Sequence, residues 1–134
     1  MATARTLSGF LVGLVLAISL SSPVEARTSQ RSMGRAVSYD GNWSVLILTN
    51  SGPCDRGYRY GLSIRGGRVF YEGSLAVNVG GQVAPNGMVR VRVSAGSQGA
   101  TGTGRLSSAG YGDGVWRGEG SSGACSGTWT AERR

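Results

Sequence analysis

Residues Tyr58–Arg65 read YRYGLSIR, Gly66 and Gly67 follow, and the chain continues as RVFYEG over Arg68–Gly73. In the first run the apolar side chains occupy every second position, so they share one face of an extended strand. A Gly-Gly pair between two such runs is typical of a two-residue hairpin turn. This stretch therefore predicts an antiparallel β-hairpin with one apolar and one polar face.

Similar alternations continue along the chain. In Met88–Ser94, three valines alternate with Arg90 and Arg92, which predicts inward-facing valines and solvent-exposed arginines. The remaining strand candidates are Trp43–Thr49, the segment in which Leu75, Val77 and Val79 share a face, Ala100–Leu106, Val115–Gly120 and Cys125–Ala131.

Glycine occurs 24 times and marks the expected turns. Asn86-Gly87 predicts a tight turn, Gly80-Gly81 is expected to end a strand, and Gly110–Gly114 is expected to be a turn. Residues 27–134 show no sustained helical periodicity. The sequence thus predicts an all-β antiparallel meander of about seven to eight strands, closed as a small barrel or packed as a two-sheet sandwich.

The N-terminal segment is typical of a signal peptide. Arg5 precedes the apolar run Leu7–Leu20, and Val24-Glu25-Ala26 offers small residues at the cleavage positions. The run is shorter than the roughly 20 residues of a membrane span, so an uncleaved anchor is the less favoured alternative. We therefore expect export to the periplasm or the exterior, a signal peptide at 1–26, a flexible basic arm at 27–38 and one β domain at 39–134.

Two cysteines, Cys54 and Cys125, lie within the predicted β domain. In an oxidising compartment such a pair predicts a disulfide. It would join the first hairpin region to the last strand and stabilise the fold by roughly 4 kcal/mol in the chain-entropy model.

The composition excludes several kinds of chemistry. The chain has 14 basic and 7 acidic residues and a net charge of +7, and all the basic residues are Arg. Without His or Lys, a Ser triad, a His-ligated metal site and Schiff-base catalysis cannot be built. We expect no catalytic residue and no metal site. The acidic residues of the β domain, expected in turns or on solvated faces, are Asp40, Asp55, Glu72, Asp113, Glu119 and Glu132.

The arginines of the central strands are the main indication of a partner, because Arg pairs bidentately with carboxylate, phosphate and sulfate. In an exported protein this favours an anionic envelope polysaccharide or a protein partner over nucleic acid, with no membrane span. The alternative is that these arginines only solubilise the surface and protect strand edges. The candidate anion-binding residues are Arg59, Arg65, Arg68, Arg90 and Arg92.

The tryptophans are candidates for a core or a groove. Strand glycines often mark places where a bulky group packs against the backbone. We expect Trp43, Trp116 and Trp129 to lie over such glycines and fill the barrel, the alternative being that the glycines floor a ligand groove. The glycines concerned are Gly102, Gly104, Gly118 and Gly120.

Four motifs carry a resemblance: YDGNWS at Tyr39–Ser44, GRLS at Gly104–Ser107, GVWRG at Gly114–Gly118 and SGACSGTW at Ser122–Trp129. Together they resemble a family of small exported bacterial proteins commonly labelled haem-utilisation or large-exoprotein related. The resemblance implies a role in haem utilisation or adhesion, with haem as the cofactor. The side chains available as haem ligands are Met33, Met88, Tyr39, Tyr58, Tyr60, Tyr71 and Tyr111.

A second likeness concerns Gly41-Asn42-Trp43. A Gly-x-Trp near the start of a single-disulfide meander barrel is similar to bacterial periplasmic protease inhibitors. In that case the arm Arg27–Val37 is the expected segment to occupy a protease cleft. A matrix or adhesion component is a third class, and it predicts self-association.

Overall fold

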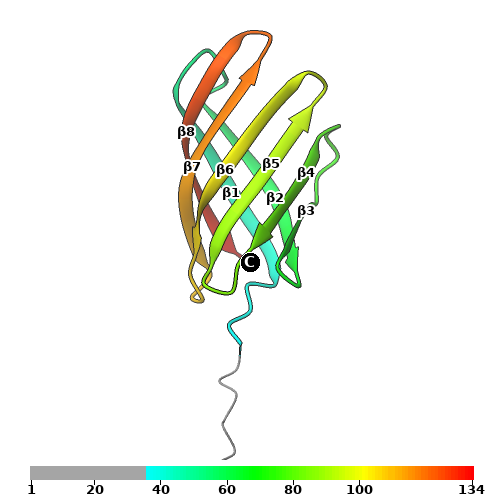
Figure 1. Cartoon of the computed structure of the whole chain (residues 1–134), viewed down its shortest axis with the longest axis vertical. Helices are drawn as coiled ribbons and strands as arrows, with labels where there is room; N and C mark the ends of the chain where they lie inside the picture. The colour runs from blue at the N-terminus through cyan, green and yellow to red at the C-terminus, as the bar shows by residue number, and fades with distance from the viewer. Residues whose placement is uncertain (1–35) are drawn as a thin grey trace, which may run out of the picture. The chain divides into compact units, whose positions relative to one another are not determined.

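The computed structural model describes residues 36–134, which form eight antiparallel strands closed into a barrel (Figure 1). The predicted signal peptide and residues 27–35 of the predicted arm lie outside the described residues. Each strand pairs with the next along the chain, and the last pairs with the first. The strands are β1 (Gly41–Ser51), β2 (Gly57–Arg65), β3 (Arg68–Tyr71), β4 (Asn78–Val83), β5 (Met88–Ala95), β6 (Gln98–Leu106), β7 (Tyr111–Gly120) and β8 (Gly123–Arg133).

The all-β prediction is confirmed, and of the two predicted architectures the structure is the barrel. The β2–β3 hairpin turns at Gly66 and Gly67, whose φ angles of 56° and 75° suit the expected two-residue turn. The β4–β5 turn lies at Asn86-Gly87, as predicted. Within residues 36–134 the structure contains no helix able to cross a membrane.

Two expectations drawn from glycines are wrong: the strand end at Gly80-Gly81 and the turn at Gly110–Gly114. Gly80 and Gly81 lie inside β4, where they pair with Arg92 and Val91 of β5. A Cβ on Gly81 would stand 2.8 Å from Cγ2 of Val91, so this glycine permits a close approach between side chain and backbone, which a Gly-Gly pair in the sequence does not distinguish from a turn.

The second wrong expectation is the turn at Gly110–Gly114. The β6–β7 connection ends at Gly110, which donates its N–H to the carbonyl of Ser107. The residues from Tyr111 onward belong to β7. Asp113 therefore lies on a strand, opposite Arg105 of β6, and not in a turn.

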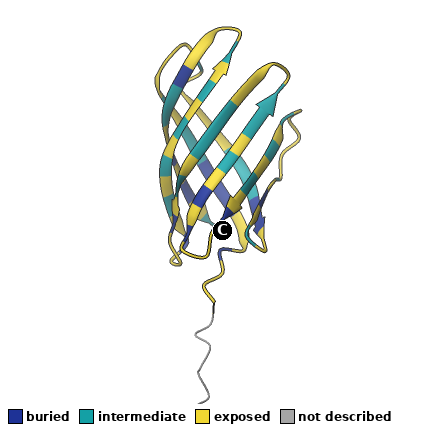
Figure 2. Cartoon of the chain, in the orientation of Figure 1, coloured by how far each residue is buried: buried dark blue, intermediate teal, exposed yellow. Residues whose placement is uncertain are grey.

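One end of the barrel is closed by side chains. Trp43 is only 2% exposed, and its indole Nε1 donates to the carbonyl of Tyr39 at 2.9 Å. The Arg133 guanidinium lies over the Trp43 ring, 5.1 Å from its centroid. This is the end at which residues 36–40 enter the barrel and the C-terminus leaves it, and it contains most of the buried residues (Figure 2).

Trp129 and Trp116 occupy the interior above that end. Trp129 packs against Gly104 and Gly114, where a Cβ on Gly114 would stand 2.6 Å from Cε2 of Trp129. Trp116 lies across Gly127 and donates from Nε1 to the Leu48 carbonyl at 2.9 Å.

The expectation that tryptophans lie over glycines is thus correct for Gly104. At Gly102 an added Cβ would be in ordinary contact with Trp129, at 3.7 Å from Nε1. Gly118 lies against Gly99 and Ala100, and Gly120 lies against the Gln98 side chain. No tryptophan covers these last two, because Trp43 and Trp116 pack elsewhere.

The predicted disulfide is present. Cys54, in the β1–β2 connection, is bonded to Cys125 of β8 across 71 positions of the sequence. The Cys54 N–H also donates to Sγ of Cys125 at 3.1 Å. The bond therefore joins β8 to the loop at the far end of β1.

Replacing Gly114 by Ala should destabilise the barrel by between about 1 and 3 kcal/mol, because the added methyl overlaps Trp129 and the Thr103 carbonyl. Gly80→Ala is the matched control, since a Cβ there meets nothing within 4 Å and should change stability by no more than about 0.5 kcal/mol. Denaturant unfolding of both variants measures the difference. Equal stabilities would contradict the close packing of Trp129.

The double substitution Cys54→Ala/Cys125→Ala should lower the free energy of unfolding by about 4 kcal/mol, because it frees a long loop in the unfolded chain. Urea unfolding monitored by circular dichroism measures this loss. A midpoint equal to that of the oxidised protein would show that the bond contributes nothing to stability.

Candidate functional site

The outer face of β3 to β7 carries a cluster of arginines, which we call the basic face: Arg68, Arg90, Arg92 and Arg117, all exposed. Arg68 and Arg90 both pair with Gln82 of β4, so they flank one glutamine from opposite sides. Arg92 and Arg117 both pair with Thr101 of β6 in the same way. Because adjacent strands lie about 4.8 Å apart, each such pair of backbones is separated by about 10 Å.

The positive charge of the basic face is not neutralised by ion pairs within the described residues. Within the described residues the one ion pair joins Arg65 to Glu72, at 3.7 Å, and it involves none of the basic-face arginines. The arginines of the basic face therefore have no carboxylate within ion-pair distance in the described part of the chain. Such guanidinium groups keep their hydrogen-bond donors available to an external anion.

The side chains of the other two predicted anion-binding arginines are engaged within the chain. Arg59, on β2, donates to Oγ of Ser44 at 3.0 Å. Arg65 pairs with Glu72 and covers the Phe70 ring at 4.7 Å from its centroid. The structure thus brings together Arg68, Arg90 and Arg92, with Arg65 opposite Arg68 at the edge of the basic face, and it separates only Arg59 from them.

A shallow groove crosses the basic face between β3 and β5. Its floor includes Gly80, where an added Cβ would meet nothing within 4 Å. The ring of Phe70, 40% exposed, and the guanidinium-bearing Arg90 and Arg92 line the groove with Gln82. An aromatic ring, an amide and cationic donors along an open groove suit a ligand with both apolar and anionic surfaces.

Sequence reasoning missed three residues of this face: Phe70, Gln82 and Arg117. Arg117 lies between Trp116 and Gly118, which alternate with it along β7, so the period of two in this segment was the signal that could have placed Arg117 on the outer face. Phe70 was missed because an apolar residue beside Val69 gives no sign of which of the two faces solvent.

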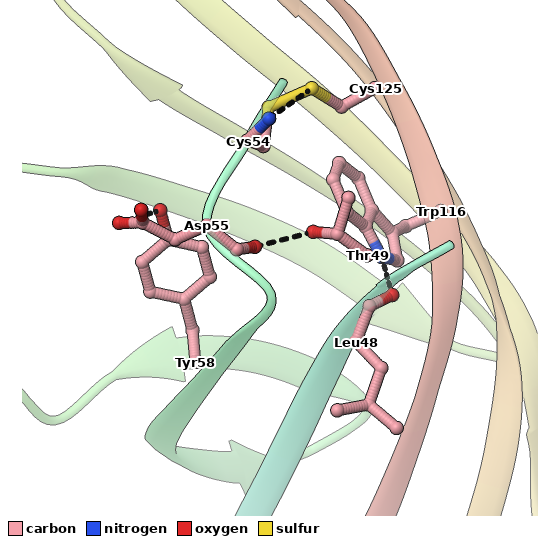
Figure 3. Close-up of a disulfide and its surroundings, with 7 residues drawn as sticks. All are labelled: Leu48, Thr49, Cys54, Asp55, Tyr58, Trp116 and Cys125. Carbon is pink, nitrogen blue, oxygen red and sulfur yellow. Dashed lines mark hydrogen bonds between the residues drawn. A yellow bond between two sulfur atoms is a disulfide. The ribbon is translucent and has the colours of Figure 1, made fainter. Parts of the chain in front are cut away.

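The opposite end of the barrel is rich in tyrosine. Tyr58 and Tyr60 of β2 stack at 6.1 Å between ring centroids, and Tyr71 of β3 meets Tyr60 edge-on at 6.0 Å. The Tyr58 hydroxyl donates to Oδ2 of Asp55 at 2.9 Å, close to the disulfide (Figure 3). Thr49 donates to the Asp55 carbonyl from the other side, which holds this loop against β1.

These contacts raise the pKa of two phenols. The hydrogen bond to Asp55 raises the pKa of Tyr58 above its ordinary value of 10.0. Burial raises the pKa of Tyr60, with a further contribution from Tyr71. Both phenols are therefore neutral hydrogen-bonding groups over the whole physiological pH range.

Three of the six carboxylates of the β domain accept hydrogen bonds from neighbouring groups. Asp40 accepts from the Gly66 N–H, Asp55 from Tyr58, and Glu72 from Ser63. Asp113 and Glu119 lie on the outer face of β7, and Glu132 lies on β8. In residues 36–134 no cluster of three His, Cys, Asp or Glu residues is placed to hold a metal ion.

The haem implied by the family resemblance does not fit inside the barrel. The internal chamber has a volume of about 110 Å³. An engineered cavity of about 150 Å³ holds a single benzene ring, so a macrocycle exceeds this space.

Comparison with known proteins gives no family model, no curated protein and no solved structure that matches the chain.

The Tyr58 phenol should titrate with a midpoint above pH 10.0, because Asp55 stabilises its neutral form. Its contribution to a phenolate titration is the part of the signal that is absent in the variant Tyr58→Phe. Since the folded pKa is raised, the contact stabilises the loop below pH 10.0 and is lost as the pH rises through the folded pKa. Asp55→Asn should move the midpoint down toward 10.0. Ultraviolet absorbance measures this, and a midpoint unaffected by Asp55→Asn would refute the coupling.

Proposed function

We propose that this protein is a non-catalytic binding module whose basic face holds an acidic polysaccharide. The observation that carries the proposal is the convergence of Arg68, Arg90, Arg92 and Arg117 on one outer surface, without a carboxylate within ion-pair distance in the described residues. The outward positions of β5 carry Arg90 and Arg92 and no acidic side chain, whereas on β7 Arg117 lies between Asp113 and Glu119. The arginines of β5 are therefore the centre of the proposed site.

The groove favours a polysaccharide over a protein partner. A protein interface needs a well-packed apolar centre, whereas this surface has one exposed ring, Phe70, surrounded by Arg, Gln and Thr side chains. The apolar face of a sugar ring can pack on the part of Phe70 that Arg65 leaves exposed, and the carboxylate or sulfate of the next unit can pair with Arg90 or Arg92. The bare floor at Gly80 lets the chain of sugars approach the sheet.

Binding at this surface should require little rearrangement. The arginines project from the central strands of a closed barrel, so their backbones are held in place by both neighbouring strands. Only side-chain freedom is lost when the polymer binds, which limits the entropic cost of association.

The other predicted functions stay predictions. The inhibitor hypothesis depends on the arm Arg27–Val37, most of which lies outside the described residues. Adhesion concerns assembly, on which the structure of one chain has no bearing. Export also remains an expectation from the sequence, and an acidic envelope polysaccharide is the partner that fits it.

The variant Arg90→Gln/Arg92→Gln should bind polygalacturonate at least tenfold more weakly than the natural chain, because it removes two adjacent guanidinium contacts. Binding of the natural chain should also weaken steeply with added salt, since exposed charges are screened. Isothermal calorimetry on soluble polygalacturonate, with neutral dextran as the negative probe, measures both effects.

Arg56→Gln/Arg59→Gln is the matched control, since both arginines are exposed. It changes the net charge by the same amount but lies outside the groove. Its affinity should stay within about twofold of the natural chain, because isolated surface charges contribute little. Equal losses in the two double variants would mean that the polymer responds only to net charge, and the proposed groove would then be abandoned.

A further inference from the structure

The interior of the barrel contains a chamber of about 110 Å³ that no function considered so far uses. Its lining comes from all around the barrel and includes the three tryptophans of the chain. The other lining residues are aliphatic apart from Gly102, Tyr60 and Thr101, and none is charged. The chamber therefore offers an apolar environment with very little hydrogen-bonding capacity.

The chamber is closed at one end and continues into a second space at the other. Trp43, Tyr39 and Arg133 seal the end near the C-terminus. At the far end a further space of about 190 Å³ lies beside the β1–β2 connection that carries Cys54 and the start of β2 that carries Tyr58. Both spaces are lined by Tyr60, Val93, Ala100, Trp116 and Ile47, so they meet at this ring of residues.

Small residues keep this space open. On β6 the inward positions Ala100 and Gly102 contribute almost no side-chain volume. At Gly102 an added Cβ would be in ordinary contact with Trp129, at 3.7 Å, so the packing of Trp129 does not require glycine at this position. By contrast, Gly104 and Gly114 on the same wall are required by the close packing of Trp129. The volume at Gly102 is therefore available in a way that the volume at Gly104 is not.

We propose that the lumen binds one slender amphipathic molecule, with an alkyl chain in the chamber and a polar head at the tyrosine-lined mouth. Eight-stranded barrels are just wide enough to be filled by side chains or to hold one small ligand. The uncharged lining selects an uncharged tail, because burying a charge there without a partner is costly.

Tyr60 is the residue assigned to the head of the ligand. It is half-buried and lines both the chamber and the mouth. Its neighbours Tyr58 and Tyr71 have hydroxyls engaged with Asp55 and with the Leu75 N–H. Burial also keeps the Tyr60 phenol neutral, so it can donate to a hydroxyl or carbonyl oxygen at the head.

The tryptophans make the proposal directly measurable. A bromoalkanol such as 8-bromo-1-octanol quenches indole fluorescence on contact, and every tryptophan of the chain lines the chamber. The N-terminal apolar run contains no Trp, so probe bound there gives no quenching. Titration of the full chain should give saturable quenching with one site, unchanged at high salt because no charge is involved.

Gly102→Val and Gly80→Val form a matched pair for this test. Both place the same side chain on a strand, but the first points into the chamber and the second onto the outer groove. We expect at least tenfold weaker probe binding for Gly102→Val and no more than a twofold change for Gly80→Val. Ala100→Phe, at the junction of chamber and mouth, should abolish saturable quenching, and circular dichroism checks that each variant is folded.

Tyr60→Phe tests the assigned head group, with an expected loss of about threefold to tenfold for a single hydrogen bond. Absence of saturable quenching in the natural chain, or equal binding by Gly102→Val, would overturn the lumen site. Unchanged binding by Tyr60→Phe would overturn the assignment of the head. Because this binding is insensitive to salt and to Arg90→Gln/Arg92→Gln, its failure is separate from failure of the proposed polysaccharide binding.

Discussion

β1 and β8 pair from Trp43 opposite Arg133 to Ser51 opposite Ser126, and this closure leaves the sheet without an open edge. It brings the two ends of the domain together, so the side chain of Arg133 can cover Trp43. It also makes one face of every strand an inner face. An open sheet of the same strands would have neither a lumen nor a sealed end.

The two ends of the barrel are held in different ways. Near the termini, Trp43 and the residues around it fill the interior, and the hydrogen bond from its indole to Tyr39 satisfies the one polar atom of that ring. At the other end a disulfide joins β8 to the loop after β1, so the wall is held without filling the space between strands. An empty chamber of about 110 Å³ costs between about 2 and 3 kcal/mol in lost packing. The covalent link offsets a loss of this size.

The local structure of each strand could be predicted from the sequence, whereas the closure of the barrel could not. Alternation correctly placed Val89, Val91 and Val93 inside and Arg90 and Arg92 outside, because a period of two is a property of each strand alone. The choice between barrel and sandwich depends on whether β1 meets β8, and no feature within either strand specifies that contact.

The candidate site shows the same division. Arg59 and Arg68 are equivalent in the sequence, each on an outward position of a strand in the first hairpin. Their separation follows from the register of β2 and β3, which places Arg68 opposite Arg65, while Arg59 lies six residues earlier on β2, opposite Leu46 of β1. The glycines misled the analysis for a related reason. Gly80 and Gly81 form a turn or a close strand contact depending on which residues lie opposite, and that information comes from β5.

β5 shows how one strand serves two surfaces. Its valines line the lumen, and the arginines between them form the centre of the basic face. Packing inside the barrel therefore fixes the backbone from which Arg90 and Arg92 project, and their Cα atoms stand about 7 Å apart because strand residues rise about 3.4 Å each. Since successive side chains point in opposite directions, a change of size at Val91 and a change of charge at Arg92 act on different surfaces. A barrel wall of this kind can carry an apolar site and an anionic site that share a scaffold and differ in chemistry.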